Sequence, residues 1–210
     1  MKNEEKSCML VATCLDLFMK FGIKSLTMAD ISKKLGISKK TLYQFVSDKK
    51  DLVKRGMVLC LEDEKQVINQ IKSESNNAIE ELIGFTKCAN SRLSDMHASV
   101  IYDLQKYHPE SWSLMEEHKK GFIKTIILEN TKRGITEGLY RDNLNPEIIA
   151  NLYITMIDSM FNAEENFGKD AKLEDLHLEL IRYHVRGVAN DKGIALLKKT
   201  LSQEGNHHLI

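Results

Sequence analysis

TMADISKKLGISKKTLYQFVSDKKDL, residues 27–52, is the stretch that decides the fold. It begins with a helix signal, because Thr27 is a good N-cap residue and Asp30 follows three positions later, as in a capping box. Apolar residues then recur at helical spacing and form one stripe, at Met28, Ile31 and Leu35. Gly36 ends this short helix where a left-handed residue is favoured. The first part of the stretch therefore predicts a short amphipathic helix with a defined start and end.

A second short helix follows after a tight turn. Ser38 is placed to cap it, and Leu42 and Val46 share its buried face, while the polar residues between them point elsewhere. Asp48 and Asp51 repeat the cap pattern for a third helix that starts at Lys49. Two short helices joined by a turn predict a helix–turn–helix.

The charge of the chain is unevenly distributed although its total is zero. Residues 1–60 hold twelve basic and six acidic residues, a net charge of +6, which leaves −6 for the remainder. A basic N-terminal module on an acidic body indicates an anionic partner for the module alone, although a solvated lysine face has the same composition.

The rest of the chain reads as a series of amphipathic helices, and no run of alternating β-branched residues predicts a sheet. We expect an all-α fold of about nine or ten helices, with a three-helix DNA-binding domain at residues 1–48 and a larger helical domain for effector binding and dimerisation at residues 49–210. The glycines at 134 and 138 are expected to loosen the end of a long helix from about residue 110. Helices expected at about 146–167 and 173–188 are strongly apolar and offer surfaces for a two-fold four-helix interface.

The helix–turn–helix region resembles the TetR family of bacterial transcriptional regulators. The resemblance covers about the first quarter of the chain and lies in Gly22, Leu26-Thr27, Ile31, Leu35-Gly36-Ile37-Ser38, Thr41-Leu42-Tyr43, Asp48-Lys49 and Leu52. Farther on, residues 134–142 look like the family's usual passage into its dimerisation helices. Lys40 departs from the family, where a small residue is common, and Val46 stands where many members have an aromatic residue. The resemblance implies a homodimer that binds double-stranded DNA and reorients its DNA-binding domains through the fourth helix when a ligand binds.

The candidate DNA-binding residues lie on and beside the second short helix. Lysine can donate to guanine, glutamine can pair with adenine, and a threonine methyl can contact thymine. The resemblance further implies phosphate contacts at Thr41, Tyr43 and Lys49, and the exposed amides at the start of the first short helix can do the same. The predicted set is Thr27, Ser38, Lys39, Lys40, Thr41, Tyr43, Gln44 and Lys49. One such module reads too few base pairs to be selective, so we expect two copies about one helical turn apart, roughly 34–36 Å, on a pseudo-palindromic operator.

The body helices are expected to enclose an effector pocket, although stripes of methionine and aromatic residues usually form a core. Bulky or polar-tipped residues on expected inward faces are the candidates: Phe85, Cys88, Tyr102, Trp112, Met115, His118, Phe122, Tyr153 and Met156. Acidic and polar groups are sparse on these faces, which favours a small apolar or amphipathic effector.

The first hypothesis is a homodimeric transcriptional repressor that responds to a ligand, and two other functions remain open. One is a regulator, activator or repressor, that lacks a small-molecule effector. The other is an enzyme on a helical bundle, for which Glu174 and His177 have Glu-x-x-His spacing but stand alone. No phosphate loop, nucleophile elbow, catalytic set, metal site or cofactor site is evident, and we expect no enzymatic activity. The N-terminal segment lacks the pattern of a signal peptide and no segment is apolar enough to span a membrane, so the expected location is the cytoplasm.

Overall fold

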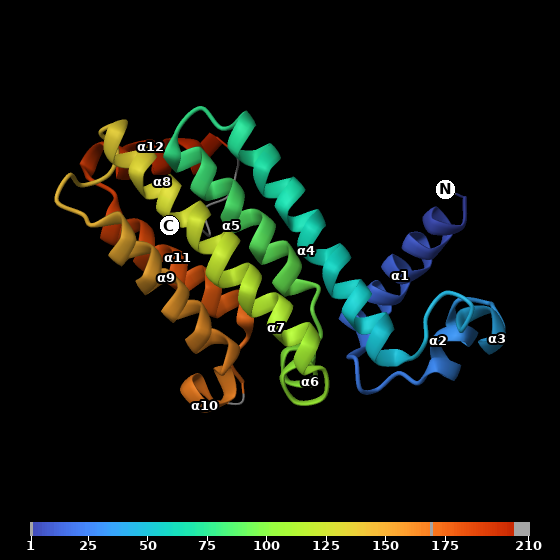
Figure 1. Ribbon diagram of the computed structural model, residues 1–210. Helices are drawn as coiled ribbons and strands as arrows, with labels where there is room; N and C mark the ends of the chain where they lie inside the picture. The colour runs from blue at the N-terminus through green and yellow to red at the C-terminus, as the bar shows by residue number, and fades with distance from the viewer. Residues whose placement is uncertain (1, 169, 204–210) are drawn as a thin grey trace. The chain divides into compact units, whose positions relative to one another are not determined.

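The computed structural model describes residues 2–168 and 170–203, and within these ranges the chain is helical and contains no β-strand (Figure 1). The prediction of an all-α fold is confirmed. The α-helices are α1 Lys2–Phe21, α2 Met28–Lys34, α3 Lys39–Leu42, α4 Lys49–Glu74, α5 Ala78–Ser94, α6 Val100–Tyr107, α7 Pro109–His118, α8 Lys124–Thr136, α9 Pro146–Phe161, α10 Ala163–Phe167, α11 Leu173–Val188 and α12 Asp191–Gln203. A π-helical segment, Lys119–Ile123, joins α7 to α8. None of the described helices combines the length and the hydropathy that a membrane-spanning segment requires.

The chain divides into two compact units. The first contains Met1–Glu64 and Asp95–His118, and the second contains Lys65–Ser94 and Lys119–Ile210. Helices α6 and α7 therefore pack with the N-terminal helices, and α4 continues from the first unit into the second. The expected boundary between a DNA-binding domain at residues 1–48 and an effector-binding and dimerisation domain at residues 49–210 divides the chain by function. It stays a prediction.

The first unit is built around one apolar core. Phe18 of α1, Ile31 of α2 and Leu42 of α3 are buried in it together with Leu52 of α4, as the apolar stripes of the sequence predict. Val100 and Leu104 of α6 belong to the same core. Helix α6 is therefore part of the body that supports the helix–turn–helix.

Two glycines set the turns of this unit. Gly22, with φ of 80°, follows the last residue of α1, and Gly36, with φ of 66°, lies between α2 and α3. Positive φ is readily adopted only by residues without a Cβ atom. The helix end predicted at Gly36 is confirmed, and Gly22 in the same way follows the end of α1.

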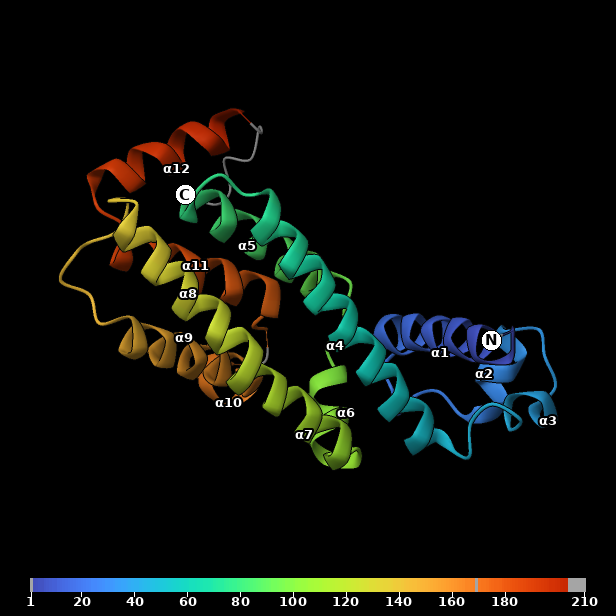
Figure 2. The same ribbon diagram turned by 45° about the horizontal axis from the view of Figure 1, so that its top comes forward.

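The second unit is a helical bundle. Helices α5, α8, α9 and α11 run alongside one another, and α12 packs against α5 (Figures 1 and 2). One core lies between α8, α9 and α11, around Ile127, Tyr153 and Ile181. Another joins α5, α11 and α12, around Ile79 and Leu197. The helices expected to form a dimer interface, α9 and α11, thus also contribute one face each to the interior of their own bundle.

The end of α8 is held by a buried tyrosine. Tyr140 is fully buried, and its hydroxyl donates to Oδ1 of Asn130 at 2.9 Å. A Cβ atom at position 134 would lie only 2.2 Å from Cδ2 of Tyr140, so the tyrosine ring occupies the space beside Gly134. Of the two glycines expected to loosen the helix end, Gly134 lies inside α8, which continues to Thr136, and its missing side chain makes room for the ring. Gly138, with φ of 67°, follows the end of the helix as expected.

Other differences from the expected helices are local. The helix expected at about 146–167 is broken at Asn162 into α9 and α10, and the helix expected from about residue 110 contains the π-helical segment. The last described helix, α12, ends at Gln203. No proline or glycine marks the break at Asn162, whereas the π-helical segment contains Gly121.

Candidate nucleic-acid interface

The N-terminus of α2 is fixed by a reciprocal cap. The Thr27 backbone N–H donates to Oδ2 of Asp30 at 2.9 Å, and the Asp30 N–H donates to Oγ1 of Thr27 at 3.2 Å. Hydrogen bonds from Thr27 hold the pKa of the Asp30 carboxyl below its usual value. The predicted capping box is confirmed, and exposed Thr27 marks the start of the helix.

Helix α3 is very short and starts with the predicted Ser38 cap. Oγ of Ser38 accepts a hydrogen bond from the Thr41 N–H at 3.0 Å. The helix ends at Leu42, and the next residues continue as tighter turns in which Gln44 and Phe45 donate to carbonyls three residues earlier. Val46 is buried as expected, although it lies beyond the end of α3.

The polar face of α3 is open to solvent. Tyr43 is 49% exposed, and Thr41 is half-buried beside Ser38. The other predicted residues on and beside this helix are exposed as well: Ser38, Lys39, Lys40 and Gln44. Buried Leu42 fixes the helix to the core, so these side chains are presented together on one short element. Such an arrangement can place basic and amide groups against the edges of base pairs.

Lys49, the first residue of α4, has a contact that the sequence does not predict. Its Nζ atom donates to the carbonyl oxygen of Leu26 at 2.5 Å, and the side chain is half-buried. Burial lowers the pKa of the Lys49 ammonium, and the nearby carboxylates of Asp103 and Asp30 raise it in part. Lys49 therefore ties the N-terminus of α4 to the residue before Thr27.

A second contact missed by sequence reasoning joins α6 to the loop between α1 and α2. Asp103 is buried, and its Oδ2 accepts a hydrogen bond from the Lys24 backbone N–H at 2.8 Å. The two residues are 79 positions apart, and no local pattern marks either as a partner. Asp103 thereby holds the segment that leads into α2.

The residues expected to line one effector pocket lie in several places. Trp112 and Met115 are half-buried against the core of the first unit, and Nε2 of His118 lies 2.8 Å from Oε2 of Glu64 in the same unit. Tyr102 is 52% exposed on α6 and accepts a hydrogen bond from Lys106, so the expectation that it faces inward is wrong.

The remaining pocket candidates belong to the second unit. Phe85, Cys88 and Phe122 come together in one small apolar cluster. Tyr153 is buried and packs edge-on against His184, while Met156 lines a surface groove between α9 and α11. The nine candidates therefore do not form a single pocket within either unit.

The histidine of the Glu-x-x-His pair considered for an enzyme is buried and bonded to a neighbouring helix. His177 is buried, and its Nδ1 atom is hydrogen-bonded to Oδ1 of Asn90 on α5. Burial lowers the pKa of His177 to about 4. Among the described residues, no group of three or more His, Cys, Asp or Glu side chains is placed to hold a metal ion.

The N-terminal region of the chain is similar to a known family of proteins. Residues 10–55 match the family model described as bacterial regulatory proteins, tetR family. This range includes most of α1, all of α2 and α3, and the start of α4. An uncharacterised HTH-type transcriptional regulator of Bacillus subtilis, YvaF, is 28% identical over 144 residues, which cover 67% of this chain and 73% of the relative.

Solved structures extend the similarity of fold over most of the chain. A TetR-family transcriptional regulator from Agrobacterium tumefaciens superposes with a TM-score of 0.68 at 15% identity, covering 89% of this chain and 99% of that one. A TetR transcriptional regulator from Chloroflexus aurantiacus gives a TM-score of 0.66 at 16% identity, covering 90% and 99%. At such identities the similarity concerns the fold alone.

Proposed function

Because the chain belongs to the tetR family of bacterial regulatory proteins, we propose that it is a homodimeric repressor, released from a pseudo-palindromic operator by a small-molecule effector. DNA binding and transcriptional regulation follow from the family. The homodimer, the direction of regulation, the effector and the individual DNA contacts are the proposal.

One observation carries the proposed DNA site. Helix α3 is capped by Ser38 and anchored by Leu42, and it leaves Tyr43 and the polar residues beside it exposed on a basic module. A buried stripe that fixes a helix, with short or bidentate polar groups on the other side, is what reading the major groove requires. Lys39, Lys40, Thr41 and Gln44 are the proposed base contacts. Tyr43, Lys49 and the backbone amides that follow Thr27 at the N-terminus of α2 are the proposed phosphate contacts, since the Thr27 N–H itself donates to Asp30.

Substitution of Tyr43 tests this assignment. Tyr43→Ala removes an exposed side chain, so we expect weaker binding to duplex DNA at fixed salt and a free energy of unfolding within about 0.5 kcal/mol of wild type. Tyr43→Phe keeps the ring and removes the hydroxyl, which separates a phosphate hydrogen bond from packing against the sugar. Unchanged affinity in both variants would remove Tyr43 from the site.

The proposed dimer interface uses the outer faces of α9 and α11. Leu152 on α9 is 54% exposed and Tyr183 on α11 is 73% exposed, and Ile148 lies on the same outer part of α9. Between the helices lies a groove of about 530 Å³ that these two helices line together with Arg141. Large exposed apolar side chains beside a groove mark an interaction surface, and a two-fold axis lets each copy present the same surface to the other.

The proposed effector site is the cluster of Phe85, Cys88 and Phe122 in the second unit. Phe122 lies in the π-helical segment, and such interruptions of a helix occur frequently at functional sites. The cluster is apolar, which suits a small apolar or amphipathic ligand. A ligand regulates the protein only if it binds the DNA-competent and released states with different affinities.

The enzyme alternative is not favoured by a specific observation. His177 already has Asn90 as its partner, and Glu174 is the only other member of its motif. We therefore propose a regulator without enzymatic activity that acts in the cytoplasm, where its DNA target is found.

A further inference from the structure

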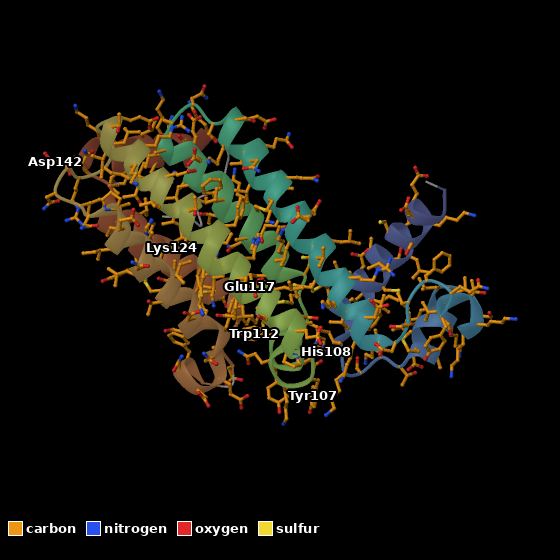
Figure 3. The ribbon with its side chains drawn as sticks, viewed as in Figure 1. Tyr107, His108, Trp112, Glu117, Lys124 and Asp142 are labelled. Atoms are coloured by element: carbon orange, nitrogen blue, oxygen red, sulfur yellow. The ribbon has the colours of Figure 1, made fainter. Side chains whose placement is uncertain are left out.

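A group of lysine and tyrosine side chains covers the corner between the α1–α2 loop and the end of α6. We call it the α6 corner, and it consists of Lys24, Tyr102, Lys106 and Tyr107 (Figure 3 labels Tyr107). Nζ of Lys24 donates to the Tyr107 hydroxyl at 2.9 Å and lies 4.7 Å from the centre of its ring. Nζ of Lys106 lies 5.0 Å from the ring centre of Tyr102 and 5.7 Å from that of Tyr107. The rings therefore hold both ammonium groups in place while Lys24 and Lys106 stay exposed.

Among the residues that the structure describes, neither Lys24 nor Lys106 forms an ion pair with a carboxylate. Asp103 lies beside it, but this carboxylate is 3% exposed and accepts from the Lys24 N–H. Glu110 on α7 is paired with Lys54 at 2.8 Å. Hydrogen bonding to Tyr107 raises the pKa of Lys24, and hydrogen bonding to Tyr102 raises that of Lys106, so both remain charged at neutral pH.

The α6 corner adjoins two of the proposed phosphate-binding positions. Lys24 precedes Thr27 by three residues, a reach of at most about 11 Å along the chain. Leu26, between them, accepts the hydrogen bond from Lys49. On the other side of the α6 corner, His108 directly follows Tyr107. Burial lowers the pKa of His108, and the nearby charges of Lys49 and Lys50 lower it further. The N-termini of α2 and α4 therefore lie next to the α6 corner.

We propose that Lys24 and Lys106 bind phosphates of the DNA backbone beyond those contacted by the helix–turn–helix. The ligand is the sugar–phosphate backbone of duplex DNA, and the contacts are independent of base sequence. The inference rests on the proposed DNA site and extends it to α6, an element outside residues 10–55 that match the family model. Prepositioned lysines lose less side-chain freedom on binding, which makes these contacts more favourable than those of freely moving lysines.

The salt dependence of DNA binding tests the proposal. Affinity for a mixed-sequence duplex of about 40 base pairs is measured by fluorescence anisotropy between about 50 and 200 mM salt. Each phosphate contact that is lost reduces the slope of log affinity against log salt by about 0.9. In the double variant Lys24→Ala/Lys106→Ala, we expect this reduction of the slope once for each of the two lysines in each bound protomer. The double arginine variant, Lys24→Arg/Lys106→Arg, should keep the wild-type slope.

A matched control removes the same charge elsewhere. Lys192 and Lys199 are exposed on α12 in the second unit, and Lys192→Ala/Lys199→Ala should leave the slope unchanged. Tyr107→Phe removes the hydroxyl that positions Lys24, so we expect lower affinity with an unchanged slope.

Three results would overturn the inference. If wild type binds and the Lys24→Ala/Lys106→Ala slope equals the wild-type slope, the α6 corner does not contact phosphates. A control slope reduced by the same amount would show a general charge effect. Failure of wild type to bind any duplex at about 50 mM salt would overturn the proposed function and this inference together.

Discussion

The Nζ atom of Lys49 lies 2.5 Å from the carbonyl oxygen of Leu26, which joins the first residue of α4 to the residue before the α2 cap. Lys49 and the N-terminus of α2, which Thr27 caps, are both proposed phosphate contacts. Since Lys49 has two further N–H groups, the same ammonium can bind the Leu26 carbonyl and a phosphate. The bond thus sets the distance between two proposed contact points on the DNA backbone.

Lys49→Met should weaken both DNA binding and the fold. The variant keeps much of the aliphatic chain but leaves the Leu26 carbonyl without this donor, so we expect the free energy of unfolding to fall by about 1 kcal/mol. Urea denaturation and binding to a fixed duplex measure the two effects, and Lys49→Arg, which keeps the charge, is the matched control. A loss of stability with unchanged DNA affinity would show that Lys49 is only structural.

Substitutions at Ser38 should separate the cap of α3 from its role at the DNA. Ser38→Ala removes the acceptor for the Thr41 N–H and should lower stability by about 1 kcal/mol. Ser38→Asp restores an acceptor but adds a negative charge at the proposed interface, so stability should return while DNA affinity stays below that of wild type. Wild-type affinity in Ser38→Asp would contradict the placement of Ser38 against DNA.

Acid should destabilise the protein through its buried histidines. Burial lowers the pKa of His184, like that of His177, to about 4, below the value of about 6.5 for an exposed histidine. The unfolded chain therefore takes up protons first as the pH falls, so the stability contributed by a neutral histidine is full above about pH 6.5 and is lost toward pH 4.

The variant His184→Phe isolates one of these groups. Each histidine should contribute a slope of up to about 1.4 kcal/mol per pH unit between pH 4 and 6.5, so the variant should lose pH dependence by that amount. Denaturation at a series of pH values and equal protein concentration measures the slope. An identical slope in wild type and variant would show that His184 is accessible to protons in the folded state.

Leu152→Arg should separate the proposed dimer. The groove beside Leu152 already contains Arg141, Arg182 and Arg186, and a two-fold interface would contain each substitution twice. We expect sedimentation of the variant as a monomer at micromolar concentration, where wild type sediments as a dimer. Ser202→Arg, at an exposed position on α12, is the control and should remain dimeric. A wild-type monomer under these conditions would contradict the proposed interface.

The local part of the fold could be predicted from the sequence because it depends on neighbouring residues. Thr27 and Asp30 form the expected capping box, and Ser38 caps α3. Gly36 adopts the expected positive φ. Such signals act over three or four residues, so a single sequence contains both members of each pair.

The rest depends on residues that are far apart in the chain. Nothing near Lys24 or Asp103 indicates that the two are bonded, and the role of Gly134 becomes visible only with the ring of Tyr140 beside it. Helical periodicity predicts the effector residues, but it only places a side chain on a face and does not say what that face packs against. For this reason the sequence predicts Tyr102 and Met156 inside one pocket, whereas the first is exposed and the second lines the groove between α9 and α11.

Selection of bound duplexes from a random pool tests the central claim most directly, because it requires both the DNA-reading face of α3 and its two-fold repetition. The account predicts enrichment of a pseudo-palindrome whose half-sites are separated by about one helical turn, roughly 34–36 Å. Loss of that enrichment in Tyr43→Ala would assign it to the proposed face. Enrichment of a single asymmetric site, or of no sequence at all, would contradict a homodimer that reads an operator through α3.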